Sequence, residues 1–278
     1  MWLRIGAPEG RRTARRRSPP SGPGLHPVAP ARCFMDESVV DACEHGTPYP
    51  DEALERLLGL IRDRPRIVLD LGCGLGELAR RIAPRVDRVH AVDASPRMIE
   101  RARSLPGADT RAIHWLAVPA ESFSFAARYA LVVAADSFLW LDWAPVMRRI
   151  ARGLSPSGTL ALLDRHHGAT PWYPDLIRLI EEYSVHREYR RCDVVDELAS
   201  RRLFDVAGVH TTAPVFYRQR VSSYVESWHS RPGLSRQRLE PERAAEFDRR
   251  LTELLGAHAR HGYLEYPVTV RLAWGRPG

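Results

Sequence analysis

Three glycines that alternate between residues 68 and 79 are the residues best suited to hold a ligand. The stretch reads VLDLGCGLGELA, so Gly72, Gly74 and Gly76 directly follow a run of apolar residues. Glycine lets the backbone turn sharply and lets a ligand approach without a Cβ in the way. The helix expected after Gly76 would offer free N–H groups to a polar end of that ligand. The segment therefore predicts a strand–turn–helix ligand site.

The residues around this turn favour a cationic ligand over a dinucleotide. The dinucleotide fingerprint needs a third glycine three positions after the second, where this chain has Glu77. An acid at a helix start is a poor host for a pyrophosphate. It suits S-adenosylmethionine (SAM), which has no phosphate and carries a sulfonium and an amino group. Asp93 ends the next apolar run, where an acid can accept both hydroxyls of an adenosine ribose.

The elements that must position these residues alternate between strands and helices. Apolar runs predict seven strands, at 66–71, 88–92, 112–117, 129–135, 159–163, 208–219 and 264–274. Helical patterns occupy 51–63, 77–83, a segment from Pro96 capped by Ser95, 143–153, 175–190, 192–201, 221–229 and 240–258. This alternation predicts an α/β fold: a doubly wound, mostly parallel seven-stranded sheet with helices on both faces.

The order and spacing of five motifs resemble the class I SAM-dependent methyltransferases. The motifs are DLGCGLG, VDASPRMIERA, PAESF, YALVVAADSFLWLDW and LSPSGTLALLD, all within residues 68–164. The similarity is greatest to the small-molecule branch that includes trans-aconitate methyltransferase-like enzymes. VSSYVESWHSR and a terminal LAWGRP are similar to the same branch. The resemblance implies a Rossmann-like methyltransferase fold, SAM as the cofactor and methyl transfer as the activity.

The resemblance also carries over a set of cofactor-binding positions. They are Asp70, Gly72, Cys73, Gly74, Gly76, Asp93, Ala94, Met98, Ala120, Glu121, Ala134 and Ala135. Asp70 would reach the methionine amino group through water, and Asp93 would bind the ribose. Met98, Ala120 and Glu121 would contact the adenine, while the carbonyls at 134 or 135 would hold the amino group. Three alternatives stay open: Asp70 as a turn cap, Met98 as plain core and Glu121 as a solvated loop acid.

The segment before the first helix departs from the family pattern. The family often has an arginine ahead of a Pro-x-Tyr-Pro sequence, and this chain has Gly46 in that place. An arginine contact from that position to the SAM carboxylate is therefore not expected. Tyr49 could cover the cofactor or pack in the core, and Trp140 matches an aromatic position at the mouth of the fourth strand.

Several acceptor classes are excluded by the stretch after the fourth strand. Residues 135–138 read ADSF, which is not the Asn/Asp-Pro-Pro-aromatic motif of amino methylation, and no Pro-Cys pair supplies a nucleophile. Asp136 and Asp142 are too few acids for a magnesium site, so no metal is expected. We expect methyl transfer to an oxygen, nitrogen or carboxylate of a small organic metabolite. The alternatives are an RNA- or protein-directed methyltransferase and a non-catalytic SAM-binding regulator.

Three histidines are candidates for a general base, which the reaction needs only if the acceptor must lose a proton. His166 and His167 follow the fifth strand at its carboxyl end, the edge where ligands bind in such sheets. His229 is the last residue of the helical pattern at 221–229. The alternative for all three is a solvated loop histidine.

The positive charge of the chain is concentrated in residues 1–34. This segment holds seven arginines and one acid, so it carries six of the seven net positive charges. Because the remainder is near neutral, no nucleic-acid partner is expected. The segment predicts a disordered tail, a misassigned start with Met35 as initiator, or a transit peptide. Residues 35–278 are predicted to form one domain, with a helical substrate-covering insertion at about 218–262.

The remaining features predict a cytoplasmic monomer or homodimer. No apolar run is long enough for a transmembrane helix, and no charged-then-apolar signal segment opens the chain. The four cysteines lack zinc spacing and fit reduced thiols. A small-molecule substrate is the expected partner, with no membrane.

Overall fold

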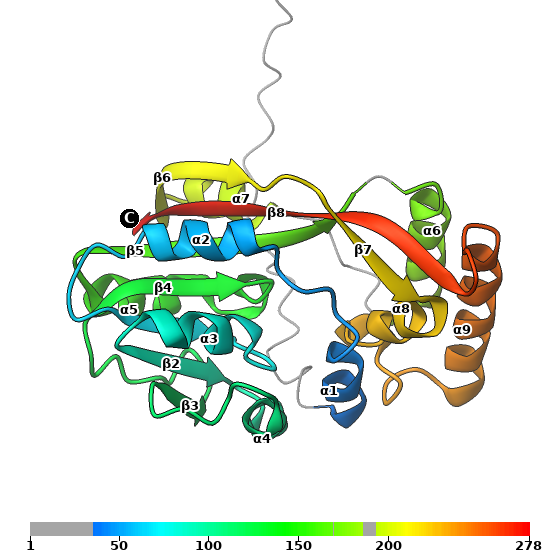
Figure 1. The fold of residues 1–278 in the computed structure, drawn as a ribbon, viewed down its shortest axis with the longest axis horizontal. Helices are drawn as coiled ribbons and strands as arrows, with labels where there is room; N and C mark the ends of the chain where they lie inside the picture. The colour runs from blue at the N-terminus through cyan, green and yellow to red at the C-terminus, as the bar shows by residue number, and fades with distance from the viewer. Residues whose placement is uncertain (1–35, 169, 186–192) are drawn as a thin grey trace, which may run out of the picture.

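A single sheet organises the computed structural model, which describes residues 36–168, 170–185 and 193–278 (Figure 1). Its strand order is β3-β2-β1-β4-β5-β8-β6, and β7 pairs with β8 outside this path. Five strands pair in parallel: β1 (Ile67–Leu71), β2 (Arg88–Asp93), β3 (Ile113–Ala117), β4 (Tyr129–Ala135) and β5 (Leu154–His167). β8 (Tyr263–Pro277) runs antiparallel to both β5 and β6 (Phe204–Thr211). The prediction of a doubly wound, mostly parallel sheet is confirmed.

The sheet has eight strands, one more than predicted. The segment expected as one strand at 208–219 is divided into β6 and β7 (Val215–Arg220). Both pair with β8, which is long enough to bind β6 along its second half and β7 along its first. Between them, the Thr212 N–H and hydroxyl bond the backbone of Val270 at 3.0 Å each, and Pro214 follows. Because proline has no N–H for a ladder bond, the pairing breaks there.

Two layers of helices cover the two faces of the sheet. α2 (Asp51–Gly59), α3 (Glu77–Ile82) and α4 (Pro96–Ser104) pack on one face, while α5 (Trp143–Gly153) and α7 (Val194–Ser200) pack on the other. Alternate residues of each strand face the two layers. In β4, Leu131 and Val133 belong to the first core and Val132 and Ala134 to the second.

A third group of helices lies beyond the carboxyl ends of the parallel strands (Figure 1). α6 (Tyr173–Tyr183), α8 (Val221–Trp228) and α9 (Pro241–Gly256) pack around Leu264, Tyr266 and Val268 of β8. We call these three helices the helical cluster. α1 (Glu37–Cys43), which the sequence did not predict, contacts both α4 and α8 and so joins the sheet to this cluster.

Short 3-10 helices complete the described chain: η2 (Ala83–Arg85), η3 (Phe138–Trp140) and η4 (Pro232–Leu234). The predictions for residues 1–34 lie outside the described residues, as do the end of the helix expected at 175–190 and the start of the one expected at 192–201. No helix in the described ranges is long and apolar enough to cross a membrane.

Candidate functional site

A cavity of about 2350 Å³ lies between the carboxyl ends of the parallel strands and the helical cluster. The glycine turn, the ends of β2, β4 and β5, and residues of α6 and α8 all contribute to its lining. Pockets for a single small ligand typically measure about 300–1,000 Å³. The cavity therefore has room for a cofactor and a second molecule together.

The three glycines of the turn have different physical requirements. All three have positive φ, at 72° for Gly72, 52° for Gly74 and 70° for Gly76. A Cβ on Gly72 would lie 2.5 Å from the Cβ of Ser137, and one on Gly76 would collide with the indole of Trp115. A Cβ on Gly74 would meet no described atom within 4 Å and would point into open space. Gly72 and Gly76 are thus required by the protein's own packing, whereas Gly74 borders the space for a ligand.

Asp93, at the end of β2, holds the glycine turn in place. One carboxylate oxygen accepts from Gly74 N–H and the other from Ser95 N–H, both at 2.9 Å. Ser95 in turn caps α4, because its hydroxyl accepts from Met98 N–H at 3.3 Å. Burial raises the pKa of Asp93, which lines the cavity together with Ala94. The residue predicted to bind ribose therefore also shapes the turn beside it.

Asp70 is a buried carboxylate with an unused oxygen. It is only 2% exposed, and its Oδ2 finds no hydrogen-bond partner among the described residues. Burial raises its pKa to about 7, with the charges of Asp93 and Glu77 adding to the effect. Buried polar atoms are nearly always satisfied. Asp70 lies two residues before Gly72 and does not itself line the cavity. Its unsatisfied oxygen suits an interaction with a cationic group.

The predicted adenine contacts divide into two groups. Met98 and Ala120 both line the cavity, and Met98 also packs against Val39 and Val40 of α1. Glu121 lies elsewhere: its carboxylate accepts from the N–H of Asp142, the N-cap of α5, at 3.0 Å. The geometry thus places the Glu121 side chain at a helix start and not in the cavity.

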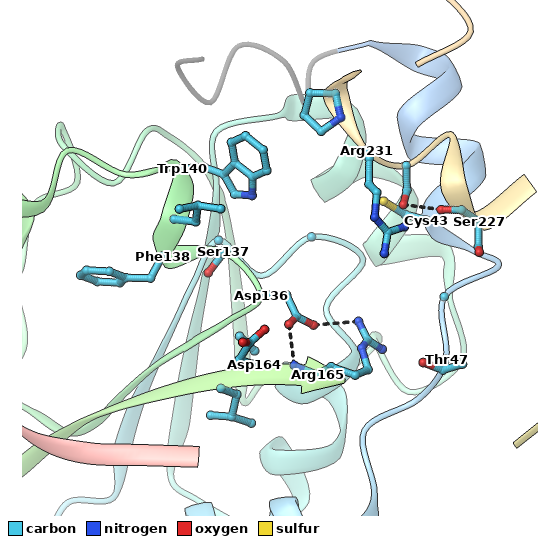
Figure 2. A pocket seen from close by; sticks show the side chains of 18 of the residues that line it. Cys43, Thr47, Asp136, Ser137, Phe138, Trp140, Asp164, Arg165, Ser227 and Arg231 are labelled. Carbon is cyan, nitrogen blue, oxygen red and sulfur yellow. Dashed lines mark hydrogen bonds and ion pairs between the residues drawn. The ribbon is translucent and has the colours of Figure 1, made fainter. Parts of the chain in front are cut away.

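The end of β4 supplies the next stretch of the lining. Ala134 and Ala135 line the cavity, and so does Trp140 in η3 (Figure 2). Between them, the Ser137 hydroxyl donates to Leu71 O at 2.8 Å and so joins the ends of β4 and β1. Asp136 has a left-handed φ of 54°, which is uncommon for a residue other than glycine.

Asp136 is the centre of a cluster that the sequence did not predict. Its carboxylate accepts from Arg165 N–H at 2.9 Å and from the Arg165 guanidinium at 3.0 Å (Figure 2). It also accepts from the Tyr49 hydroxyl at 2.6 Å. The guanidinium also lies 4.4 Å from the centre of the Tyr49 ring. Burial, followed by the charge of Asp136, raises the Tyr49 pKa well above its ordinary value, so the hydroxyl stays a donor.

Comparison with known proteins agrees with this architecture. Residues 68–158 match the model of a methyltransferase domain. An uncharacterized methyltransferase of Mycobacterium tuberculosis is 38% identical over 130 residues, which are 45% of this chain and 50% of that protein. A trans-aconitate 2-methyltransferase of Streptomyces avermitilis is 35% identical over 174 residues, 60% of this chain and 59% of that protein. The chain thus spans about half the length of the curated relatives it matches.

A solved structure extends the similarity beyond the matched segment. A SAM-dependent methyltransferase from Geobacter sulfurreducens, in complex with S-adenosylhomocysteine, has a TM-score of 0.51 at 18% identity. The match covers 89% of this chain and 98% of that one, and it concerns the fold alone. Residues 68–158 of this chain carry a methyltransferase domain, and the chain is similar to SAM-dependent methyltransferases. The family resemblance carried by the five motifs is therefore confirmed.

The three candidate histidines lie in different surroundings. His166 lines the cavity, but its side chain is 39% exposed and lies 3.1 Å from Asp164. His167 lines it too, and its pKa falls to about 3 because of burial and then the charges of Arg231 and Arg165. His229 is fully buried outside the cavity, between Leu234 O at 2.6 Å and Asp248 at 2.7 Å. It ties a loop to α9 and faces no ligand space.

Sequence reasoning missed three further residues of the lining. Arg165 follows the fifth strand, a position that could have been a signal because ligands bind at carboxyl ends of strands. Arg231, whose guanidinium lies 3.7 Å from the centre of the Trp228 ring, ends the family-like segment VSSYVESWHSR, but that segment gave it no role. Thr47 is 4% exposed, and its hydroxyl has no partner among the described residues. Only their assembly in space brings these residues to one cavity.

The described cysteines and metal-ligating side chains form neither a reactive thiolate nor a metal site. Cys43 and Cys73 both line the cavity and form no disulfide. Burial raises the pKa of Cys43 to about 12 and that of Cys73 well above its ordinary value, so neither is a reactive thiolate near pH 7. No group of three or more metal-ligating side chains gathers in the described part of the chain.

Proposed function

We propose that this chain transfers a methyl group from SAM to an oxygen, nitrogen or carboxylate of a small organic molecule. The observation that carries the proposal is the single cavity that joins the glycine turn to the helical cluster. SAM supplies an electrophilic methyl group, and much of the catalysis of its transfer consists of positioning donor and acceptor. A shared cavity provides that positioning.

The cofactor end of the cavity fits SAM residue by residue. Gly74 leaves open space beside the turn, and Asp93 lies at the cavity wall where a ribose can bind. The orphaned oxygen of Asp70 suits an ammonium group bound through water. Acids around the turn favour the sulfonium and amino group of SAM and disfavour a phosphate ligand.

The opposite end of the cavity fits an organic acceptor. Tyr217, Trp228 and Tyr266 line it, and the His167 ring lies 5.1 Å from that of Tyr266. Aromatic walls with a few polar groups are typical of small-molecule pockets. The helical segment predicted at about 218–262 contributes Trp228, which supports a role for that segment as a cover over the acceptor.

The surroundings of His167 favour an acceptor that is already nucleophilic. Because burial and two neighbouring guanidinium groups hold its pKa near 3, the imidazole is neutral at pH 7 and a weak base. We assign it the role of a hydrogen-bond partner that orients the acceptor. An acceptor atom with a free lone pair, or an oxygen ionised in solution, needs no base in the site.

Turnover of SAM tests the proposal. The full chain is incubated with methyl-labelled SAM and pools of small acids, phenols and amines, and S-adenosylhomocysteine and labelled product are quantified. We expect labelled product from at least one pool. Labelling of RNA or protein alone would assign the activity to the macromolecular alternatives. The absence of any thermal shift with SAM or S-adenosylhomocysteine would overturn the proposal altogether.

A further inference from the structure

We propose that Arg165 and Thr47 form a carboxylate-binding site, and that its ligand is the carboxylate at the methionine end of SAM. The inference rests on the proposed function, because it concerns the same cavity. Gly46 has no side chain that could contact the SAM carboxylate. The proposal assigns this contact to β5 and to the loop before α2.

The Arg165 guanidinium has N–H donors that the described residues do not use. A guanidinium has five N–H donors. Arg165 uses its Nη2 on Asp136 and lies over the Tyr49 ring, and its Nη1 and Nε donate to no acceptor in the described ranges. Two parallel N–H groups of this kind match the two oxygens of a carboxylate. The bond to Asp136, drawn in Figure 2, and the contact with the Tyr49 ring hold the guanidinium in a fixed orientation at the cavity wall.

Thr47 supplies an independent observation that points to a ligand. It is buried, it lines the same cavity, and its Oγ1 lacks a partner in the described part of the chain. An unsatisfied buried hydroxyl costs about 1–3 kcal/mol, so a partner from outside the chain is expected. Thr47 is two residues before Tyr49, the ring on which Arg165 lies, and Figure 2 shows the Thr47 and Arg165 side chains in the lining of the same pocket. A hydroxyl and a guanidinium are both donors suited to a carboxylate, which has two acceptor oxygens.

The contacts of Arg165 favour the cofactor as the source of the carboxylate. Its partner Asp136 directly follows β4, and Tyr49 N–H donates to Glu77, the first residue after the glycine turn, at 2.7 Å. Arg165 is thus joined through two residues to the turn where the methionine end would lie. The acids near the turn suit the amino group of SAM, and the guanidinium suits the carboxylate on the same carbon.

The test compares SAM with decarboxylated SAM, which keeps the amino group and lacks only the carboxylate. Calorimetric titration of the full chain should show at least about tenfold tighter binding of SAM, the range expected for a charge-assisted hydrogen bond. In Arg165→Gln this preference should disappear while binding of decarboxylated SAM is retained, which also checks the fold. Thr47→Val should reduce the preference by about threefold.

The control is Arg249→Gln on α9, which removes an equal charge from an exposed arginine paired only with Glu246 and Glu253 among the described residues. It should leave the preference intact. If Arg165→Gln keeps the preference but weakens binding of benzoate to the protein saturated with S-adenosylhomocysteine, the carboxylate site serves the acceptor and the cofactor assignment is wrong. If neither changes, the site itself is disproved. If the wild-type chain binds neither SAM nor decarboxylated SAM, the proposed function is disproved as well.

Discussion

The two ends of the cavity are built in different ways. The proposed cofactor end consists mainly of backbone at the ends of strands or directly after them, at 72–74, 93–94 and 134–137. The acceptor end consists of side chains from segments far apart in the sequence, such as His167, Tyr217, Trp228 and Tyr266. A site made of backbone requires small residues at fixed spacings and so leaves a motif. A site made of side chains requires only that the fold bring them together, and it leaves none.

The largest effect is expected at the backbone-built end, from Gly74→Asp. A Cβ there points into the open cavity, and the left-handed φ of 52° disfavours any side chain. The added carboxylate would occupy the space beside the turn, so SAM affinity should fall on the order of a hundredfold or more while the sheet remains folded. Thermal shift with S-adenosylhomocysteine measures binding, and circular dichroism measures the fold.

Gly262→Asp is the matched control for this variant. Gly262 has a similar φ of 76° and equally open surroundings in the described structure, but it lies between α9 and β8 and outside the cavity. Its replacement should cost stability by backbone strain and leave SAM affinity unchanged. Equal losses of affinity in the two variants would mean that strain, and not occupied ligand space, explains the Gly74 result.

A smaller effect is expected from Asp93→Ala. The variant removes the acceptor for two ribose hydroxyls and for the N–H groups of Gly74 and Ser95. Each lost partner costs about 1–3 kcal/mol, so SAM affinity should fall by at least about tenfold. Asp93→Asn, which keeps one oxygen, should lie between this variant and the wild type in calorimetry. Unchanged affinity in Asp93→Ala would show that the ribose binds elsewhere.

The pH dependence of stability should depend on Asp70. Burial raises its pKa from an ordinary 3.8 to about 7, so the folded protein binds a proton that the unfolded chain releases. This contribution to stability is complete below pH 3.8 and is lost as the pH rises through about 7. Asp70→Asn, which mimics the protonated form, should unfold at a higher temperature than the wild type at pH 8, and this difference should shrink as the pH falls and vanish below pH 3.8. Parallel melting curves at all pH values would contradict the assignment.

The smallest effect is expected from Glu121→Gln. Because the Glu121 carboxylate accepts from Asp142 N–H outside the cavity, its charge should matter little for the cofactor. SAM affinity should change by about twofold or less, and the melting temperature should fall slightly through the weaker cap. A tenfold loss of affinity would restore the adenine contact that the family resemblance implies.

The sequence predicted the sheet more completely than the site. Buried parallel strands and amphipathic helices leave periodic patterns, so β1 to β4 and α2 to α5 were located close to their observed bounds. The strand predicted at 159–163 was too short, because β5 extends beyond it at both ends. α1 was not predicted, because seven residues are too few for a periodic signal. Among the site residues, Gly74 and Asp93 were predictable because backbone geometry and strand ends fix them. Arg165 and Thr47 were not, because their role depends on which side chains they meet in space.

β8 runs without a break from the helical cluster into the central sheet. Its first half, with Tyr266 and Val268, belongs to the core of the helical cluster, and its second half, with Val270 and Leu272, belongs to the core of the central sheet. Because both parts share this strand, a bend between them would break its pairing with both β5 and β7. The proposed cofactor end and the proposed acceptor end of the cavity are therefore held in place by the same strand.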